Sequence, residues 1–413
     1  MSLQDIFLSV TGAESAELEA PIVAIVETTA EEAAEAVVDK EIAEIEKDVT
    51  EVCAEQEKQE TAIEAVEEKI EDLQEQVDGM EKMMSGETPF NAALFAHHYN
   101  RGAKIMAKFG ATVDHHGAES FADASTANLN ALAGCESMKE TAVKAGAAVK
   151  NFFISLFNGF IAAIVGLFNK FKGIEKKGEI VKAKVAKSEG GKGEVTRTGK
   201  MLYAGPTGSV DHVASAVTKA ATSLAIALGN GNPEAMVSEV QKVANDLASM
   251  GKKTVKGSDD SSETWEIAAQ DAIITIVSPK NEAGLAKVRL THAAANSSSK
   301  APALDKAKLS SICDSVIAEA KKMQANKLGE SALKTARDKA IGQIEKASAD
   351  GKAKIEVIRN GHKAAMKLLQ GAMDVGATAL EGALAFVNAN LGGKGDAAAD
   401  QKKLDNKEDN KED

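Results

Sequence analysis

The sequence has few aromatic residues and few cysteines. Its 413 residues include one Trp, two Tyr and three Cys, whereas Ala, Lys, Glu and Val dominate. This composition favours helix over sheet, and the length is sufficient for two or three domains. The cysteines, Cys53, Cys135 and Cys313, lie far apart and match no metal-ligand spacing, so we expect reduced thiols and no disulfide framework. We also expect no cofactor.

Catalytic and nucleotide-binding motifs are missing as well. The chain has no G-x-S-x-G, no paired-Cys motif, no H-E-x-x-H and no Asp-rich calcium loop. The stretch 193–201 imitates a phosphate loop, but Glu194 and Met201 stand where such a loop requires Gly and Ser or Thr. The pairs His97-His98 and His115-His116 have no Cys or carboxylate at a motif spacing. We therefore predict no catalytic residues, no metal site and no enzymatic activity.

The beginning of the chain lacks the basic stretch that starts a secretory signal, because residues 1–20 carry four acids and no Lys or Arg. The segment from Ser2 to Val10 predicts a short amphipathic helix that Thr11-Gly12 interrupts. Its apolar residues are Leu3, Ile6, Phe7 and Val10. Residues 18–29 contain Pro21 and a β-branched run, and they predict a loop or a frayed lead-in to the next helix.

A heptad pattern runs from Val38 to Met84. The apolar positions are Val38, Ile42, Ile45, Val49, Val52, Ile63, Val66, Ile70, Leu73, Val77, Met80 and Met84. This spacing predicts one helix, roughly 70 Å long, whose apolar stripe needs a helical partner. The flanking positions are mostly acidic: Glu41, Glu46, Asp48, Glu55, Glu60, Glu67 and Glu81. Because two parallel copies would repel each other, we expect a basic helical partner for residues 38–84, either another protein or a basic part of the same chain.

Charge is distributed very unevenly along the chain. Residues 1–90 contain 26 Asp or Glu and 5 Lys, whereas residues 91–394 carry a net charge of +11 within a chain of net −13. An acidic arm joined to a basic body indicates that the arm masks the charge of the body, or that the protein has different partners at two stages of its life. The most basic segment is residues 170–187, where the lysines outnumber Glu175 and Glu179. These candidate contacts for DNA or for the acidic arm are Lys170, Lys172, Lys176, Lys177, Lys182, Lys184 and Lys187.

Aromatic residues gather in one part of the chain, since ten of the twelve Phe lie between Phe90 and Phe171. Within it, residues 151–169 are uncharged and would span roughly 28 Å as a helix. The candidate membrane or core residues are Phe152, Phe153, Phe157, Phe160 and Phe168. A polar or small stripe runs through Asn151, Ser155, Asn158, Ala162 and Asn169. This pattern favours a buried core helix, and the alternatives are a segment that acts on a membrane at some stage and an oligomer seam.

These observations predict a mainly α protein built from five consecutive parts. Residues 1–89 form an acidic coiled-coil arm or propeptide, and residues 90–189 form a Phe-rich helical module with the hydrophobic helix 151–169 and the basic helix 170–187. Residues 190–330 form a small α+β module with a helical hairpin over 209–250 and strands near 264–292, among them 272–277 and 286–291. Residues 331–391 form C-terminal helices, and residues 392–413 form a disordered charged tail.

This layout of an acidic N-terminal arm, a short hinge and a basic Ala/Lys-rich helical remainder resembles the internal head proteins of large tailed bacteriophages, also called inner-body or prohead core proteins. The resemblance implies a structural protein of the virion interior, assembled in the host cytoplasm with other capsid or core proteins. It also implies that a head maturation protease removes the arm, cutting after a Glu that follows a small or aliphatic residue two positions earlier. The matching tripeptides end at Glu67, Glu75 and Glu87.

The sequence therefore favours an internal head protein whose acidic arm masks a basic body that associates non-specifically with packaged DNA. One alternative is a membrane-active protein that is ejected with the genome and uses residues 151–169. A second is a cellular coiled-coil scaffold. The two alternatives differ from the first in whether the Phe-rich helix meets lipid and whether the arm is removed.

Overall fold

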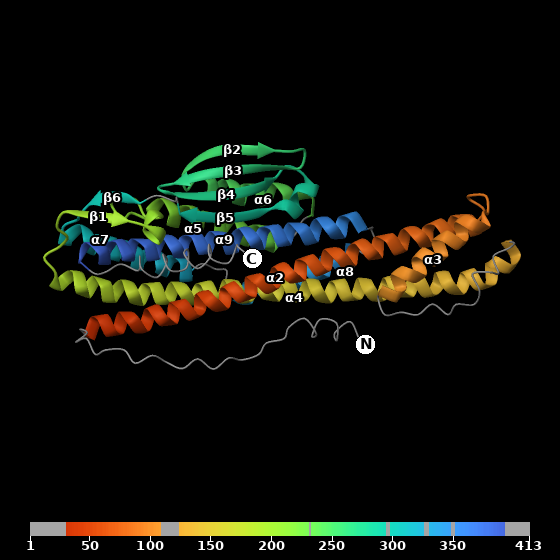
Figure 1. The fold of residues 1–413 in the computed structure, drawn as a ribbon, viewed down its shortest axis with the longest axis horizontal. Helices are drawn as coiled ribbons and strands as arrows, with labels where there is room; N and C mark the ends of the chain where they lie inside the picture. Colours follow the sequence, from red (N-terminus) through yellow and green to blue (C-terminus); the bar gives the residue numbers. More distant parts are fainter. Residues whose placement is uncertain are drawn as a thin grey trace, which may run out of the picture. The chain divides into compact units, whose positions relative to one another are not determined.

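A computed structural model describes residues 30–108, 124–230, 233–294, 298–325, 330–347 and 352–392. Within these ranges the protein is mainly α, with a small antiparallel β module, as the sequence predicts (Figure 1). The predicted amphipathic helix of residues 2–10 and the predicted disordered tail lie outside the described residues, apart from the first position of that tail. The chain forms two compact units that are discontinuous in sequence, with residues 56–156 in the first and residues 26–55 and 157–413 in the second. The five consecutive parts expected from the sequence stay a prediction.

The first unit is a small helical core. It contains the second half of α2 (Ala30–Met84), the helix α3 (Ala92–Lys108) and the first part of α4 (Ala124–Lys187). Its buried side chains are Leu73, Val77, Met80 and Met83 from α2, Phe95, Tyr99, Ile105 and Met106 from α3, and Met138 from α4. The heptad positions of α2 supply the apolar stripe that this core needs. Gly102 leaves room for Met138, whose sulfur lies 2.7 Å from where a β-carbon would be.

The second unit contains the first half of α2 and the remainder of α4. Heptad positions Val38 and Ile42 are buried, and Ile42 packs so closely on Gly173 of α4 that a β-carbon there would lie 2.8 Å from its side chain. The sequence predicted a hydrophobic helix over residues 151–169 and a basic helix over residues 170–187. The structure instead has one continuous α4, because no Pro or left-handed Gly interrupts residues 124–187.

The helix α9 (Lys352–Asn390) forms the centre of the second unit. It packs against α5 (Asp211–Asn230), α6 (Pro233–Ala248), α7 (Lys306–Ala325) and α8 (Glu330–Ala347), and against β5 of the sheet. From Ile358 to Asn390 its residues are buried or half-buried on every side. Such all-round burial requires apolar or small residues around the whole helix, and Ala, Gly, Leu and Met provide them. Gly382 is one such residue, because a β-carbon there would lie 2.0 Å from the carbonyl oxygen of Lys200.

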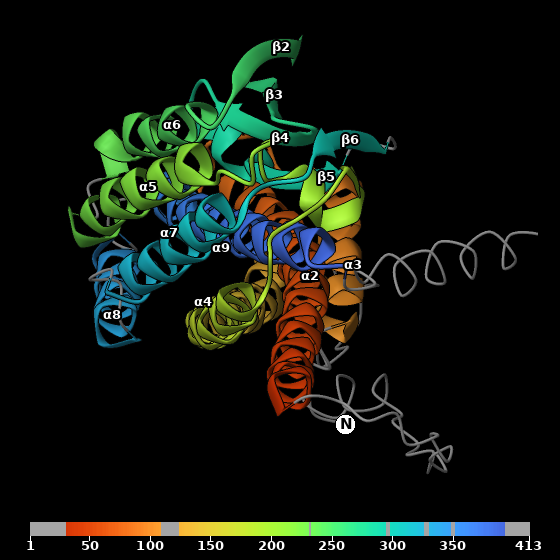
Figure 2. The same ribbon diagram turned by 90° about the vertical axis from the view of Figure 1, so that its left-hand side faces the viewer.

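The β module contains two antiparallel sheets. A two-stranded sheet pairs β1 (Glu194–Arg197) with β6 (Ser299–Pro302). A four-stranded sheet has the order β2 (Lys252–Ser258), β3 (Ser262–Ala269), β4 (Ala272–Pro279) and β5 (Arg289–Ala294). Helices α6 and α9 cover one face of the larger sheet (Figure 2). Residues that alternate along each strand point to this covered face, and they include Trp265, Ile267, Ile274 and Ile276.

Several local predictions agree with the fold, and one strand is displaced. The predicted hairpin corresponds to α5 and α6, and the predicted strand 272–277 lies within β4. The predicted strand 286–291 is wrong at its start, because residues 282–287 form the 3-10 helix η3 and β5 begins at Arg289. Asn281 caps η3 by accepting a hydrogen bond from the amide of Gly284. A second 3-10 helix, η2 (Gly199–Leu202), follows β1.

Candidate functional site: the acidic arm on the basic helix

The first half of α2 places its carboxylates on the lysines of α4. Lys177 Nζ lies 2.6 Å from Asp39 and 3.9 Å from Glu35, and Lys176 Nζ lies 3.7 Å from Glu41. Lys184 pairs with Glu35, and Lys187 pairs with Glu31. The residue numbers increase along α2 as they decrease along α4, so the two helices run antiparallel with their charges in register. Glu35 is buried and also accepts a hydrogen bond of 2.6 Å from the side-chain amide of Asn388 on α9.

A second group of charges lies around Lys170. The Nζ atom of this lysine is 2.7 Å from Glu46, 3.6 Å from Glu381 and 4.0 Å from Asp374. Lys200 of η2 contacts Glu46 at 2.9 Å and Glu381 at 2.8 Å. The side chain of Lys170 is only 3% exposed and that of Glu381 only 8%. Four elements, α2, α4, η2 and α9, are therefore joined by one ionic network.

The network shifts the pKa of Glu46 and of Lys200 in the direction that keeps each of them charged. Burial acts to raise the pKa of Glu46, but Lys170 and Lys200 together lower it to about 2. Burial acts to lower the pKa of Lys200, yet Glu381 and Glu46 hold that pKa above its ordinary value. A buried charge is stable only when opposite charges compensate its lost hydration, and each member of this group supplies that compensation to another.

The network extends through Asp374 to the β module. His292 on β5 contacts Asp374 through Nε2 at 2.9 Å, and Tyr203 contacts His292 Nδ1 at 2.8 Å. The hydrogen bond with His292 contributes to lowering the pKa of Asp374, although burial opposes it. Because an ionised carboxylate can only accept, Nε2–H of His292 donates to Asp374, and in the neutral imidazole Nδ1 then accepts from the tyrosine hydroxyl. Burial and the charge of Asp374 raise the pKa of Tyr203 to about 12, so this hydroxyl stays protonated in its contact with His292.

Five of the seven candidate lysines form ion pairs with acidic residues of α2. These are Lys170, Lys176, Lys177, Lys184 and Lys187. Lys182 instead contacts Asp314 on α7 at 2.5 Å, and Lys172 is exposed. Sequence reasoning missed Lys200, Asp374, Glu381 and His292, which join the same network from other elements. No local motif marks these four residues, because only the packing of α9 brings them to Lys170.

The three candidate cleavage positions lie in different surroundings. Glu67 and Glu75 lie within α2, and Glu75 is exposed. Glu87 follows the end of α2 in an exposed turn where Gly86 adopts a φ of +79°. Proteases bind substrates in extended form, so the segment around Glu87 is available without unwinding a helix.

The Phe-rich segment is largely packed inside the second unit. Phe157 and Phe160 are buried and Phe168 is half-buried, whereas the side chains of Phe152 and Phe153 lie outside the described part. Among the described helices, one stretch, Ile154–Lys187, is long and apolar enough to cross a membrane, and half of its most apolar window is buried within the protein. Burial of this kind is typical of the core helix of a folded unit.

The histidine pairs provide no assembled metal site in the part of the chain that the structure describes. His98 contacts the side chain of Gln76 at 2.8 Å through Nδ1, and His115-His116 lies outside the described residues. Among the described residues, no three His, Cys, Asp or Glu side chains are grouped so that they could hold a metal ion.

The described chain is thus a mainly α protein whose long helices are joined by ion pairs. A sequence profile of phiKZ-like phage internal head proteins matches residues 44–392, which is well over half of the chain. The chain therefore belongs to this family, and it is a structural protein of the phage head interior. No curated protein and no solved structure matches the chain. The profile begins within α2 and includes Glu46, Lys170, Lys200, Asp374 and Glu381.

Proposed function

We propose that the acidic arm, residues 1–87, masks the basic body of this internal head protein during assembly in the host cytoplasm, and that a maturation protease cuts after Glu87. The proposal rests on the matched order of acids along α2 and lysines along α4. In that order, the pairs are Glu31 with Lys187, Glu35 with Lys184, Asp39 with Lys177 and Glu46 with Lys170. These carboxylates neutralise the lysines that a phosphate backbone would otherwise contact.

The charge of the product supports the same proposal. A cut after Glu87 leaves residues 88–413, which carry a net charge of +8, whereas the intact chain carries −13. Packaged DNA is a dense polyanion, and a protein that neutralises its phosphates binds with little sequence preference and with strong salt dependence. Loss of the arm thus converts a protein that DNA repels into one that DNA attracts.

The position of Glu87 makes it the favoured cleavage point of the three. Cutting at Glu67 or Glu75 requires local unfolding of α2, and packing of Leu73 and Val77 in the first unit opposes that unfolding. A cut after Glu87 leaves the contacts of α2 intact, so release of the arm is a second step. In that step the phosphates of DNA compete with the carboxylates of α2 for Lys176, Lys177, Lys184 and Lys187.

A full-length protein with an added cleavage site after α2 tests whether the acidic arm masks the basic body. A recognition sequence for a specific protease is inserted between Gly86 and Glu87, and DNA binding is compared before and after cutting. We expect the cut protein to bind a random duplex at about 50 mM salt and to lose most of that affinity by about 200 mM. Equal binding before and after cutting would refute the masking.

The lysines are tested in the same cut protein. The double change Lys176→Glu with Lys184→Glu should remove most of the DNA binding and reduce its salt dependence. The matched control is Lys252→Glu with Lys308→Glu, which changes the net charge equally at exposed positions on β2 and α7. If both pairs of changes act equally, net charge rather than the site controls binding.

Mass spectrometry of the protein from finished heads tests the cut itself, and an intact Met1 or Ser2 terminus would exclude it.

A further inference from the structure

Two glycines of α4 bring the acidic arm unusually close to the body. A β-carbon at Gly173 would lie 2.8 Å from the side chain of Ile42 on α2, and one at Gly166 would lie 2.6 Å from the side chain of Val49. Real β-carbons essentially never lie so close to another heavy atom, so glycine is required for this approach of the two helices. Each glycine is a notch in α4 that receives one branched side chain of α2.

The glycine notches, Gly166 and Gly173, follow the same alignment as the ion pairs. The notches are seven residues apart on α4, and the side chains that fill them are seven residues apart on α2. Two ion pairs, Asp39 with Lys177 at 2.6 Å and Glu46 with Lys170 at 2.7 Å, have the same spacing on both helices. Steric contacts and charges are independent of each other, and both specify one antiparallel register.

A shift of α2 by seven residues would lose one kind of contact or the other. In one direction both branched side chains would still meet a glycine, because residue 159 is also Gly, but Glu46 would lie opposite Ala163 instead of a lysine. In the other direction Ile42 would lie opposite Ile180, where no notch exists. Only the observed register satisfies the notches and the charges together.

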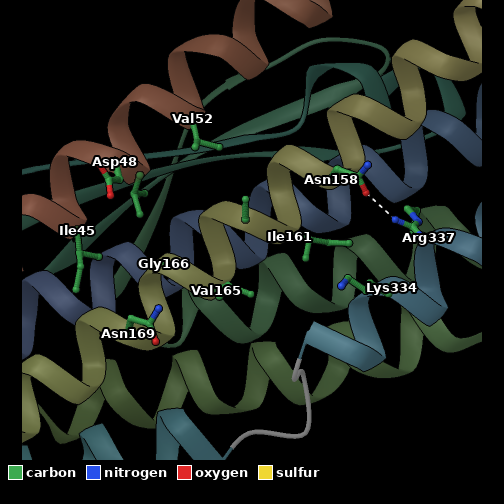
Figure 3. Close-up of a pocket in the computed structure, with 12 residues that line it drawn as sticks. Ile45, Asp48, Val52, Asn158, Ile161, Val165, Gly166, Asn169, Lys334 and Arg337 are labelled. Carbon is green, nitrogen blue, oxygen red and sulfur yellow. Dashed lines mark hydrogen bonds between the residues drawn. The ribbon is translucent and has the colours of Figure 1, made fainter.

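The contact at Gly166 adjoins an open groove of the second unit. The walls of this groove are α2 and α8, its floor is α4, and its volume is about 690 Å³ (Figure 3). Arg337 of α8 donates a hydrogen bond of 2.7 Å to the side-chain oxygen of Asn158 on the floor. Because the space between α2 and α8 is open here, α8 does not hold α2 against α4 at this point.

We propose that Gly166 and Gly173 position the acidic arm, because they set the register that brings its carboxylates onto the lysines of α4. Filling either notch would then lift α2 from these lysines without any cut. The inference rests on the proposed masking, yet the two make separate predictions. The notches decide whether α2 stays on α4, and the masking decides whether its absence lets DNA bind.

Two native cysteines report the position of the arm in the full-length, uncut protein. Cys53 is half-buried on α2, with its sulfur 2.6 Å from the side-chain amide of Gln370 on α9, whereas Cys313 on α7 is fully buried. Thiol labelling resolved by peptide mass spectrometry therefore detects detachment of α2 at Cys53 and loosening of the body at Cys313. We expect Gly166→Ala and Gly173→Ala each to speed labelling of Cys53 at least about tenfold, because overpacking a tight contact is unfavourable. Labelling of Cys313 should stay slow.

Gly178→Ala is the matched control on the same helix. A β-carbon at Gly178 would lie 2.8 Å from Ile317 of α7, so the added methyl group meets α7 instead of α2. This change should speed labelling of Cys313 and not of Cys53. A rescue variant adds Ile42→Val to Gly173→Ala, which conserves the total side-chain volume, and it should return Cys53 to slow labelling.

DNA binding by the same uncut variants separates the two proposals. We expect Gly166→Ala and Gly173→Ala to bind a random duplex at about 50 mM salt, where proteins that contact phosphates bind well. Fast labelling of Cys53 without DNA binding would refute the masking and support the role of the notches. Labelling of Cys53 that stays at the wild-type rate in both glycine variants, or that Ile42→Val fails to slow, would overturn that role.

Discussion

Glu46 of α2 and Lys170 of α4 meet at 2.7 Å, and the lysine side chain is only 3% exposed. The pair joins the two long helices at a point where Lys200, Asp374 and Glu381 also converge. Burying Lys170 is favourable only while carboxylates surround it. The contact of the acidic arm with the body therefore contributes to the stability of the second unit itself, and not only to masking.

Replacing Glu46 with Gln tests this contribution. The neutral amide removes a charge from two lysines, and we expect a loss of about 2 kcal/mol in the free energy of unfolding, below the range for fully buried pairs because Glu46 is 35% exposed. Glu44→Gln is the control, because Glu44 makes an exposed pair with Lys40 at 3.9 Å and should cost less than about 0.5 kcal/mol. Equal effects in urea denaturation would contradict a special role for Glu46.

The acid dependence of that difference follows from the pKa of Glu46. Folding lowers this pKa from 4.5 to about 2. A carboxylate with a lowered pKa stabilises the fold above its ordinary pKa, and this stabilisation disappears as the pH falls through the folded value. We expect the stability gap between wild type and Glu46→Gln to be constant from about pH 7 to 5 and to shrink between about pH 4.5 and 2. A gap that persists at about pH 2 would assign the effect to the shape of the side chain instead of its charge.

Phe160→Asp distinguishes a core helix from a membrane-active one. Phe160 is 2% exposed, so an aspartate there buries an uncompensated charge as well as creating a cavity, and we expect a loss of more than about 4 kcal/mol. Thermal unfolding followed by circular dichroism measures it, with Phe160→Leu as a milder control at about 1–1.5 kcal/mol. A variant that keeps its fold but no longer floats with liposomes would favour the membrane-active alternative.

Gly382→Ala tests the close approach of α9 to η2. A β-carbon at Gly382 would lie 2.0 Å from the carbonyl oxygen of Lys200, so the backbone must move, and we expect a loss of about 1–3 kcal/mol. Gly342 in α8 has no atom within 4 Å of the same position, and Gly342→Ala should instead stabilise the helix by about 0.5–1 kcal/mol. Differential scanning calorimetry of both variants gives opposite signs if the packing is as described. Stabilisation by both changes would show that η2 can move away freely.

The sequence by itself determines the long helix α2, because a repeat of apolar residues at Val38, Ile42 and onward is a local property of the chain. It also determines the hairpin of α5 and α6 and the apolar strand β4, whose signals lie within a few neighbouring residues. The acidic and basic segments are equally visible in the sequence. Which acid meets which lysine is not visible, because pairing depends on the register of two helices that are more than a hundred residues apart.

Only the tertiary structure decides that α9 is the central helix. Its Ala, Gly and Lys residues resemble those of an ordinary surface helix, and burial on every side comes from the helices and strands packed around it. The same packing brings Asp374 and Glu381 to Lys170, and His292 to Asp374. A charged residue carries no local mark of burial, since the fold alone decides whether water or an opposite charge surrounds it.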